Sequence, residues 1–387
     1  MDTTQQSVIT LLRSAVTGKA LPLPEDFDLQ KVVPFARRHQ MVPLIYEGAV
    51  LCGVESPLMS KFFAGYCKAI QIHEGQMSLL GRILEAFEEA GVDYMPLKGC
   101  KMKALYPKPE LRIMGDADVL IRLEQYDRIV PILEQLGLTQ IDDTDHELVW
   151  ENQSLNLELH KRLIPSYNKD FFAYFGDGWQ LAKQNNGHCF RMKPEDEWIY
   201  ELTHFAKHFR DGGIGCRHVV DLWMYQRANP KLDEAYLEQE LQKLQLWDFH
   251  RNICALIRYW FEDGQADEIT EIIGQYILAS GSWGAIENRV RSLTVRDAQH
   301  AAPGVSGKLV YILKKLFPPC NVLKKKYTVL QKAPWLLPVI WLVRPFYKVL
   351  FERKSLDKQK REMDALNKED LDEHHQMLRR MGIDYNF

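Results

Sequence analysis

The sequence predicts an α+β fold, with a strand-containing core between helical N-terminal and C-terminal regions. Three observations predict it: apolar residues recur at helical spacing through residues 1–75, strand and helix patterns interleave from about 92 to 190, and only helix patterns follow Pro194. A chain of 387 residues has room for two or three domains. We expect four regions: a helical region at 1–75, an α+β core at 76–192, a helical domain at 193–300 and a basic, apolar helical region at 301–387.

The composition excludes several classes of protein. With 46% apolar and 26% charged residues, the chain has ordinary globular usage and is neither disordered nor of low complexity. A net charge of −3 provides no overall field for nucleic acid, so we expect no specific nucleic-acid partner. The seven cysteines are dispersed without a CxxC pair, which indicates reduced thiols. The first residues lack a signal-peptide pattern, so we expect a cytoplasmic protein.

The elements of the core can be predicted in chain order. Residues 74–90 form the clearest amphipathic helix, and Gly91 follows where a left-handed cap is favoured. Residues 92–97 are expected to form a short strand, and Pro96 places its end or an edge there because proline cannot donate to a ladder. A helix at 100–106, a strand at 116–121 and a helix at 124–136 follow. Two further strands are expected at 146–150 and 155–160, and a long helix from Pro194.

Three acidic residues give the strongest functional signal. Asp116 and Asp118 alternate at the start of a strand and therefore share a face, about 6–7 Å apart. Residues 155–160 alternate leucine with Asn156, Glu158 and His160, so these three polar residues also share a face. If the two strands pair, Glu158 joins the aspartates, and three carboxylates suit a divalent cation that serves phosphoryl or nucleotidyl transfer.

The alternative is that these acids are ordinary surface groups. Asp-x-Asp also occurs at residues 26/28, 143/145 and 370/372, but none of these leads into an apolar strand with a phosphate-friendly loop upstream. A basic loop ahead of the aspartates favours the functional interpretation, because Gly99 lies at a strand-to-helix junction where backbone N–H groups are free to hold an anion. Lys98, Lys101, Lys103 and Arg112 surround that junction. A tight turn with solvated lysines would give the same pattern.

The motifs, taken as an ordered set, resemble a known family. The set comprises Tyr-Met-Pro-Leu-Lys-Gly at 94–99, Leu-Arg at 111–112, Met-Gly-Asp-Ala-Asp-Val-Leu-Ile at 114–121, and Glu-Leu-His at 158–160. It resembles an uncharacterised nucleotidyltransferase family of the polymerase-beta-like nucleotidyltransferase superfamily, whose helical region is also matched by His204, His208 and Asp221. The ordered match covers residues from about 76 to 225.

The resemblance implies a mixed sheet that holds Mg²⁺ or Mn²⁺ with an NTP, and transfer of NMP to an unidentified hydroxyl acceptor. The resemblance also implies that Asp116, Asp118 and Glu158 are the catalytic and metal-binding residues. The nucleotide-binding residues are expected to be Lys98, Gly99, Cys100, Lys101, Arg112, His160, His204 and His208. Cys100 departs from the Gly-Ser of many superfamily members and supplies no hydroxyl to phosphate. A catalytically degenerate nucleotide-binding protein is therefore the alternative.

A histidine cluster supports a third interpretation. His204 and His208 lie one helical turn apart, and His218 and Asp221 follow a glycine-rich break. Together they are a candidate transition-metal site of a phosphohydrolase. The other interpretations are hydrogen bonds at a helix contact, with Asp221 as the partner of an arginine or histidine, or a cleft beside the triphosphate. For His160, either a role that orients the Glu158 carboxylate or a place at a sheet edge is consistent with the pattern.

The C-terminal region combines positive charge with apolar residues. Residues 308–354 contain nine lysines and two arginines against one acid, Glu352. The apolar run Trp335–Val343 has nine residues with Pro338 inside, which is too short to span a bilayer that needs about 20. The segment predicts peripheral contact with acidic lipid headgroups or, alternatively, an amphipathic region that packs against the helical domain and is basic on its wet side.

Overall fold

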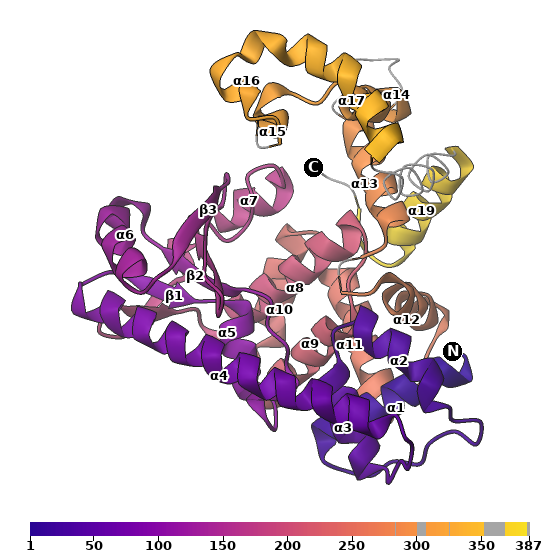
Figure 1. Ribbon diagram of the computed structural model, residues 1–387. Coiled ribbons are helices and arrows are strands. Elements are labelled where there is room, and N and C mark those ends of the chain that lie inside the picture. The colour runs from indigo at the N-terminus through magenta and orange to yellow at the C-terminus, as the bar shows by residue number, and fades with distance from the viewer. Residues whose placement is uncertain (283, 300–306, 325, 352–367, 385–387) are drawn as a thin grey trace. The chain divides into compact units, whose positions relative to one another are not determined.

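The computed structural model describes residues 1–282, 284–299, 307–324, 326–351 and 368–384 (Figure 1). The chain forms two compact units. The first unit comprises Met1–Lys207 and Ile214–Ser282, and the second comprises His208–Gly213 and Trp283–Phe387. The four regions predicted from the sequence are a finer division, which stays a prediction.

Four helices open the first unit, as predicted for a helical N-terminal region: α1 (Thr3–Thr17), α2 (Leu29–Arg38), α3 (Val42–Leu51) and α4 (Met59–Glu89). Asp2 caps α1, because its side chain accepts a hydrogen bond from the backbone N–H of Gln5 at 2.8 Å. Helix α4 begins well before the predicted residue 74. Its early turns bury only Phe62 and Ala69, so the sequence shows no apolar stripe there. It ends before Gly91, whose φ of +67° is the left-handed conformation predicted for a cap.

The core of the first unit is a seven-stranded mixed sheet in the order β3-β4-β5-β2-β1-β7-β6. Strands β2 and β5 are parallel, as are β1 and β7, and the other neighbours are antiparallel. The strands are β1 (Tyr94–Pro96), β2 (Ala117–Ile121), β3 (Thr139–Asp143), β4 (Glu147–Glu151), β5 (Asn156–His160), β6 (Lys183–Asn186) and β7 (Cys189–Arg191). The strands predicted near 92–97, 116–121, 146–150 and 155–160 are therefore confirmed, and Pro96 is the last residue of β1.

Three strands were not predicted from the sequence. Strand β6 is exposed along its whole length, and β3 nearly so, because both lie at the edges of the sheet and carry polar residues. Neither shows the alternation of apolar and polar residues that marks a half-buried strand. Strand β7 has only three residues and none of them is buried.

One face of the sheet carries the apolar core. Val119, Leu157 and Leu159 on the central strands pack with Phe87 of α4 and Leu133 of α6 in one buried cluster. Figure 1 shows α4 running along the sheet. The shorter helices around the sheet are α5 (Lys98–Met102), α6 (Tyr126–Gln135), α7 (Lys169–Phe175) and the 3₁₀ turns η1 (Lys103–Leu105), η2 (Pro109–Leu111), η3 (Leu123–Gln125) and η4 (Trp179–Leu181). Val119 of β2 and Leu157 and Leu159 of β5 thus point one way, which leaves the residues that alternate with them on the opposite face.

After β7, every regular element among the described residues is helical, as predicted. The helices are α8 (Pro194–Asp211), α9 (Cys216–Ala228), α10 (Glu234–Lys243), α11 (Trp247–Phe261) and α12 (Glu268–Ser280). Trp198, Phe205 and Phe249 are fully buried among them. Within the described residues, no helix combines the length and the apolarity that crossing a membrane requires.

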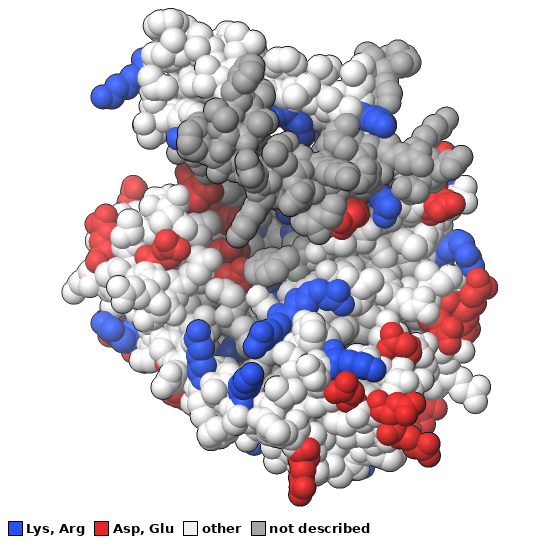
Figure 2. Space-filling view, turned by 45° about the vertical axis from the view of Figure 1, so that its right-hand side comes forward, with Lys and Arg blue, Asp and Glu red and all other residues white. Residues whose placement is uncertain are grey.

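The second unit is also helical. Its elements are α13 (Ile286–Gln299), α14 (Gly307–Leu316), α15 (Cys320–Leu323), α16 (Val329–Lys332), η5 (Pro334–Leu336), α17 (Leu337–Phe351) and α19 (Lys368–Arg380). Val290 of α13 and Tyr311 of α14 form its small buried cluster. The face of the molecule in Figure 2 carries basic and acidic side chains without one sign covering it, in agreement with a net charge near zero.

Candidate functional site

Two neighbouring strands bring the predicted acidic residues together. Strands β2 and β5 are parallel, and their register places Asp118 opposite Glu158 and Leu120 opposite His160. Asp118, Glu158 and His160 therefore project from the face opposite the apolar core, and one ligand atom from each lies within 4.8 Å of the others. The predicted pairing of these strands is confirmed. His160 is not at a sheet edge, because β5 lies between β4 and β2.

Asp118 is the centre of this group. It is 3% exposed, and its Oδ1 accepts a hydrogen bond from Lys98 Nζ at 2.9 Å. His160 Nε2 lies 2.8 Å from the same oxygen and 3.8 Å from Glu158 Oε2. An ionised carboxylate only accepts hydrogen bonds, so Nε2 of His160 donates to it. The imidazole thus orients Asp118 and leaves the carboxylates of Asp118 and Glu158 as the oxygen ligands available to a cation.

Lys98 takes a place that sequence reasoning did not foresee, since the lysine was expected to contact phosphate. It is the first residue of α5, two residues after the end of β1, and its φ of +38° is unusual for a residue other than glycine. The backbone N–H of Leu97 donates to the carbonyl of Asp118 at 2.9 Å, which brings the start of α5 beside β2. No sequence pattern signals this ion pair, because it depends on the pairing of β1 with β2.

The charges of this group are strongly coupled. Burial by itself would raise the pKa of Asp118, but Lys98 and His160 outweigh it and hold that pKa well below its usual range. Burial would likewise lower the pKa of Lys98, and Asp118 raises it well above its usual range. Burial and the charge of Lys98 lower the pKa of His160, so the imidazole is neutral at neutral pH.

Glu158 shows why the site suits a cation. Burial, followed by the negative charges of Asp118 and Asp116, raises the pKa of Glu158 to about 8. The protein thus holds its carboxylates close enough to repel one another, and a divalent cation would relieve that repulsion. Two carboxylates are hard oxygen ligands of the kind that Mg²⁺ and Mn²⁺ prefer, so the residues present fit such an ion.

Asp116 lies at the border of the group. It immediately precedes β2, is half-buried and is not among the three residues whose ligand atoms meet. Burial and the adjacent Asp118 raise the pKa of Asp116. It therefore contributes negative charge to the site, and its role as a metal ligand stays a prediction.

The glycine and cysteine of the basic loop have packing roles. A Cβ on Gly99 would lie 3.1 Å from Arg112 Nη1 and 3.2 Å from Met114 Cγ, so a larger residue would have to displace them. The Sγ of Cys100 lies 3.8 Å from the backbone oxygen of Asp118. Burial and the charge of Asp118 raise the pKa of Cys100 to about 12, so its thiol is neutral. Contact of either residue with nucleotide stays a prediction.

Two basic residues predicted to bind nucleotide are paired with carboxylates on helices. Lys101 forms an ion pair with Glu197 of α8. Arg112 donates from Nε and Nη2 to the two oxygens of Asp221 on α9, at 2.8 and 2.9 Å, and Tyr106 donates to Asp221 at 2.7 Å. The expectation that Asp221 is the partner of a neighbouring arginine is confirmed. These pairs fasten the loop to α8 and α9, and nucleotide binding by Lys101 and Arg112 stays a prediction.

The histidines of α8 and α9 do not form a metal site among the described residues. His204 is half-buried and His208 is exposed. Burial and Arg217 lower the pKa of His218 to about 3, while Asp221 is held by Arg112. In the described part of the chain, the acidic group with His160 is the one set of three or more ligating residues close enough to share an ion. Nucleotide binding by His204 and His208 stays a prediction.

Sequence reasoning missed three residues around the site. Glu147 of β4 lies opposite His160 in the antiparallel register, and its carboxylate is 2.8 Å from His146 Nε2. Tyr200 and Glu201 lie on α8, and both are electrostatically coupled to Lys98. Burial, Glu197 and Asp221 raise the pKa of Glu201 to about 8. Glu147 could have been found from the alternation along its strand, whereas the helical pattern gives no sign of the other two.

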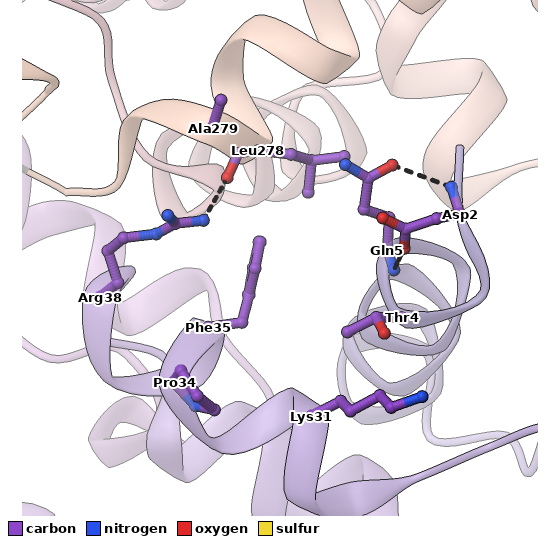
Figure 3. A pocket seen from close by; sticks show the side chains of 9 residues that line it. All are labelled: Asp2, Thr4, Gln5, Lys31, Pro34, Phe35, Arg38, Leu278 and Ala279. Atoms are coloured by element: carbon purple, nitrogen blue, oxygen red, sulfur yellow. Dashed lines mark hydrogen bonds between the residues drawn. The ribbon is translucent and has the colours of Figure 1, made fainter.

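A separate hollow lies among the first helices and α12. It has a volume of about 590 Å³ and is lined by Asp2, Thr4, Gln5, Lys31, Pro34, Phe35, Arg38, Leu278 and Ala279. Figure 3 shows Arg38 reaching across to the backbone oxygen of Leu278, to which it donates at 2.8 Å. Asp2 and Gln5 are engaged in the cap of α1. The hollow shares no residue with the acidic group.

Comparison with known proteins adds one match. A family model described as "Uncharacterised nucleotidyltransferase" matches residues 25–262. Neither a curated protein nor a solved structure matches the chain significantly. The matched range includes every residue of the acidic group and the ion pairs of its loop, and it ends before the basic segment 308–354.

Proposed function

The chain belongs to the uncharacterised nucleotidyltransferase family, and from this premise we propose that it transfers NMP from an NTP to a hydroxyl group of an acceptor, with Mg²⁺ or Mn²⁺ at Asp118 and Glu158. The observation that carries the proposal is the convergence of Asp118, Glu158 and His160 on adjacent parallel strands. Such a pair of strands within a mixed sheet supports a polymerase-beta-like arrangement.

The protein's own residues have distinct parts in the proposed reaction. Lys98 and His160 hold the Asp118 carboxylate in place through hydrogen bonds of 2.9 and 2.8 Å. Glu158 accepts the proton of the acceptor hydroxyl, whose oxygen attacks the α-phosphorus. The bond from that phosphorus to the β-phosphate oxygen breaks, and pyrophosphate leaves. A bound divalent cation supplies neutralisation of the charge that develops on the phosphate oxygens.

The experiment combines labelled NTPs with Mg²⁺ or Mn²⁺, fractions of a cell extract as a source of acceptors, and the purified chain. Transfer of the α-phosphate label with release of pyrophosphate is expected. Asp118→Asn should reduce the transfer at least about 100-fold. Loss of a metal ligand should lower activity by more than the 10–100-fold typical of residues that only hydrogen-bond to a ligand. Asp26→Asn, which alters an exposed Asp-x-Asp elsewhere, is the matched control. Turnover without divalent cation, or unaffected by Asp118→Asn, would contradict the proposal.

One observation favours a second candidate function. Asp118 Oδ1 already accepts hydrogen bonds from Lys98 and His160, so a cation must compete with an ion pair that neutralises the carboxylate. A degenerate centre that binds NTP without turnover would retain such a pair. Thermal stabilisation by NTP detects binding, because a ligand present at 100 times its Kd adds about 2.7 kcal/mol to the stability, and label transfer measured beside it distinguishes the candidates. Stabilisation without label transfer in any acceptor fraction would favour the degenerate protein.

A further inference from the structure

Exposed apolar side chains are concentrated in the second unit. Of the sixteen large apolar side chains that are exposed in the described part of the chain, ten lie between residues 309 and 343. They are Leu309, Leu313, Leu316, Phe317, Val322, Val329, Trp335, Val339, Leu342 and Val343. Exposed apolar side chains scattered singly are ordinary, whereas a concentration of them indicates an interaction site.

These side chains form stripes on two helices. On α14, Leu309, Leu313 and Leu316 are spaced by four and three residues and so lie on one face. Tyr311, on the other side of α14, is buried against Val290 of α13. The exposed stripe is therefore the face that α14 does not use for packing against the described part of its unit.

The second stripe is on α17, where Val339, Leu342 and Val343 are spaced by three and one residues. Leu342 is 71% exposed. Trp335 lies in the turn η5 that leads into α17 and is 76% exposed, an unusual position for the largest apolar side chain.

Side-chain contacts join α14 and α17 into a hairpin. Trp341 Nε1 of α17 donates to the backbone oxygen of Pro318 at 2.8 Å, and its ring lies edge-on to Phe317 with 5.3 Å between centroids. Arg344 donates to the backbone oxygen of Lys315 at 2.9 Å. Both stripes thus belong to one structural piece, which we call the α14–α17 hairpin and which spans residues 307–351.

The same piece is strongly basic. From residue 307 to 351 the sequence has eight lysines and one arginine and no acid. Lys308, Lys324 and Lys332 are exposed, and Lys332 precedes the exposed Trp335 by three residues. The cores of protein–protein interfaces are depleted in lysine, whereas here lysines alternate with the apolar residues at intervals of a few positions.

We propose that the α14–α17 hairpin binds the surface of a membrane that carries anionic headgroups. The boundary between headgroups and acyl chains accepts apolar side chains and lysines together, and tryptophan is favoured there. Each lysine near an anionic surface adds attraction, so neutral lipid should bind far more weakly. The helices lie on the bilayer, since no helix among the described residues is long and apolar enough to cross it.

Flotation of the full chain with vesicles tests the proposal. Phosphatidylcholine vesicles with 30% phosphatidylglycerol are compared with pure phosphatidylcholine, and at least about tenfold stronger partitioning to the anionic vesicles is expected. Leu342→Ser/Val343→Ser should reduce that partitioning at least about tenfold. Leu123→Ser/Ile141→Ser removes two apolar side chains of the first unit, each 52% exposed, and should leave the partitioning unchanged. Lys324→Glu/Lys332→Glu should weaken anionic binding, and Lys183→Glu/Lys231→Glu, also exposed, should not.

Quenching by brominated lipid gives a second readout. Quenching should fall in Trp335→Phe relative to the unaltered chain, because Trp335 enters the lipid boundary. Absence of binding to either vesicle, equal binding to both, or equal losses in the control variants would overturn the proposal. Self-association that Leu342→Ser/Val343→Ser abolishes, without vesicle binding, would also overturn it and assign the stripes to a second copy of the chain.

Discussion

Buried charges at the site depend on their immediate neighbours, and Lys98 is the most instructive of them. Its ammonium compensates Asp118, which would otherwise be a carboxylate 3% exposed with one histidine for a partner. The same positive charge disfavours a proton on His160. One lysine therefore lowers the pKa of two groups on two strands.

Replacement of Lys98 by methionine should raise the pKa of His160. Removal of the lysine eliminates a repulsive charge and leaves Asp118 free to stabilise an imidazolium. Titration of the His160 ring protons by NMR measures the shift, with Lys183→Met at an exposed position as the control. An unchanged or lowered pKa of His160 would show that Lys98 does not act on this imidazole.

Glu201 provides a prediction on stability. Burial, Glu197 and Asp221 raise its pKa to about 8, far above the unfolded value near 4.5. The folded state thus keeps the proton to higher pH than the unfolded state does. The contribution of protonated Glu201 to the free energy of unfolding is fully present below about pH 4.5 and is lost as the pH rises through 8.

Between pH 5 and 8 the unaltered chain should therefore lose stability relative to Glu201→Gln, by an amount on the order of a few kcal/mol. Urea unfolding at a series of pH values measures it. For Glu134→Gln, at an exposed position of α6, the unfolding free energy should depend on pH as it does in the unaltered chain. If the unfolding free energy of Glu201→Gln also showed the pH dependence of the unaltered chain, the pKa of Glu201 would not be raised.

Between elements, the loop that leads into β2 is fastened to α9 by a buried ion pair. Arg112 and Asp221 are 6% and 4% exposed and share two hydrogen bonds. The surface pair of Arg251 and Asp248 differs, since its side chains are 68% and 78% exposed and its closest atoms are 3.8 Å apart. The two pairs have the same chemistry and opposite burial.

Asp221→Asn should cost about 3–5 kcal/mol of unfolding free energy, because it leaves the Arg112 guanidinium buried with a neutral partner. Asp248→Asn should cost less than about 1 kcal/mol. Denaturant unfolding of both variants provides the comparison. Equal small losses of unfolding free energy in the two variants would mean that the buried Arg112 does not need Asp221 as its partner. Such a result would favour the prediction that Arg112 binds nucleotide.

The elements also show how far the sequence alone could lead. Alternation of leucine with polar residues at 155–160 was enough to predict β5 and the shared face of Glu158 and His160. The neighbour of β5 in the sheet could only be conjectured, because pairing of strands distant in sequence depends on the packing of the whole core. The edge strands β3 and β6 were missed since their exposed polar residues carry no hydrophobic period.

The candidate site, too, could be predicted from the sequence only in part. The carboxylates of Asp118 and Glu158 were predicted from strand periodicity and the family resemblance. The pairing of Lys98 with Asp118 could not be predicted, because a lysine in a loop is normally solvated and only the antiparallel register of β1 and β2 brings it inward. The partners of Lys101 and Arg112 on α8 and α9 likewise depend on tertiary structure.

At the scale of the whole molecule, the acidic group and its ion pairs all belong to the first unit, and the family match ends at residue 262. The exposed apolar stripes belong to the second unit. The proposed nucleotide chemistry and the proposed lipid contact therefore fall in different units of the chain.

A chain shortened to residues 1–282 should retain nucleotide binding, because it keeps every residue of the acidic group. Thermal unfolding with and without ATP and Mg²⁺ measures this, with Asp118→Asn in the same shortened chain as the control. The shift of the melting temperature should match that of the full chain. A shortened chain that is folded by circular dichroism but shows no shift would mean that residues beyond 282 complete the site.

The central claim is that Asp118 and Glu158 jointly hold a divalent cation. Mn²⁺ binding to the purified full chain, followed by electron paramagnetic resonance, measures this without knowledge of the acceptor. We expect saturable binding that Asp118→Asn and Glu158→Gln each abolish and that Asp26→Asn leaves intact. Mn²⁺ binding that persists unchanged in both Asp118→Asn and Glu158→Gln would contradict the claim.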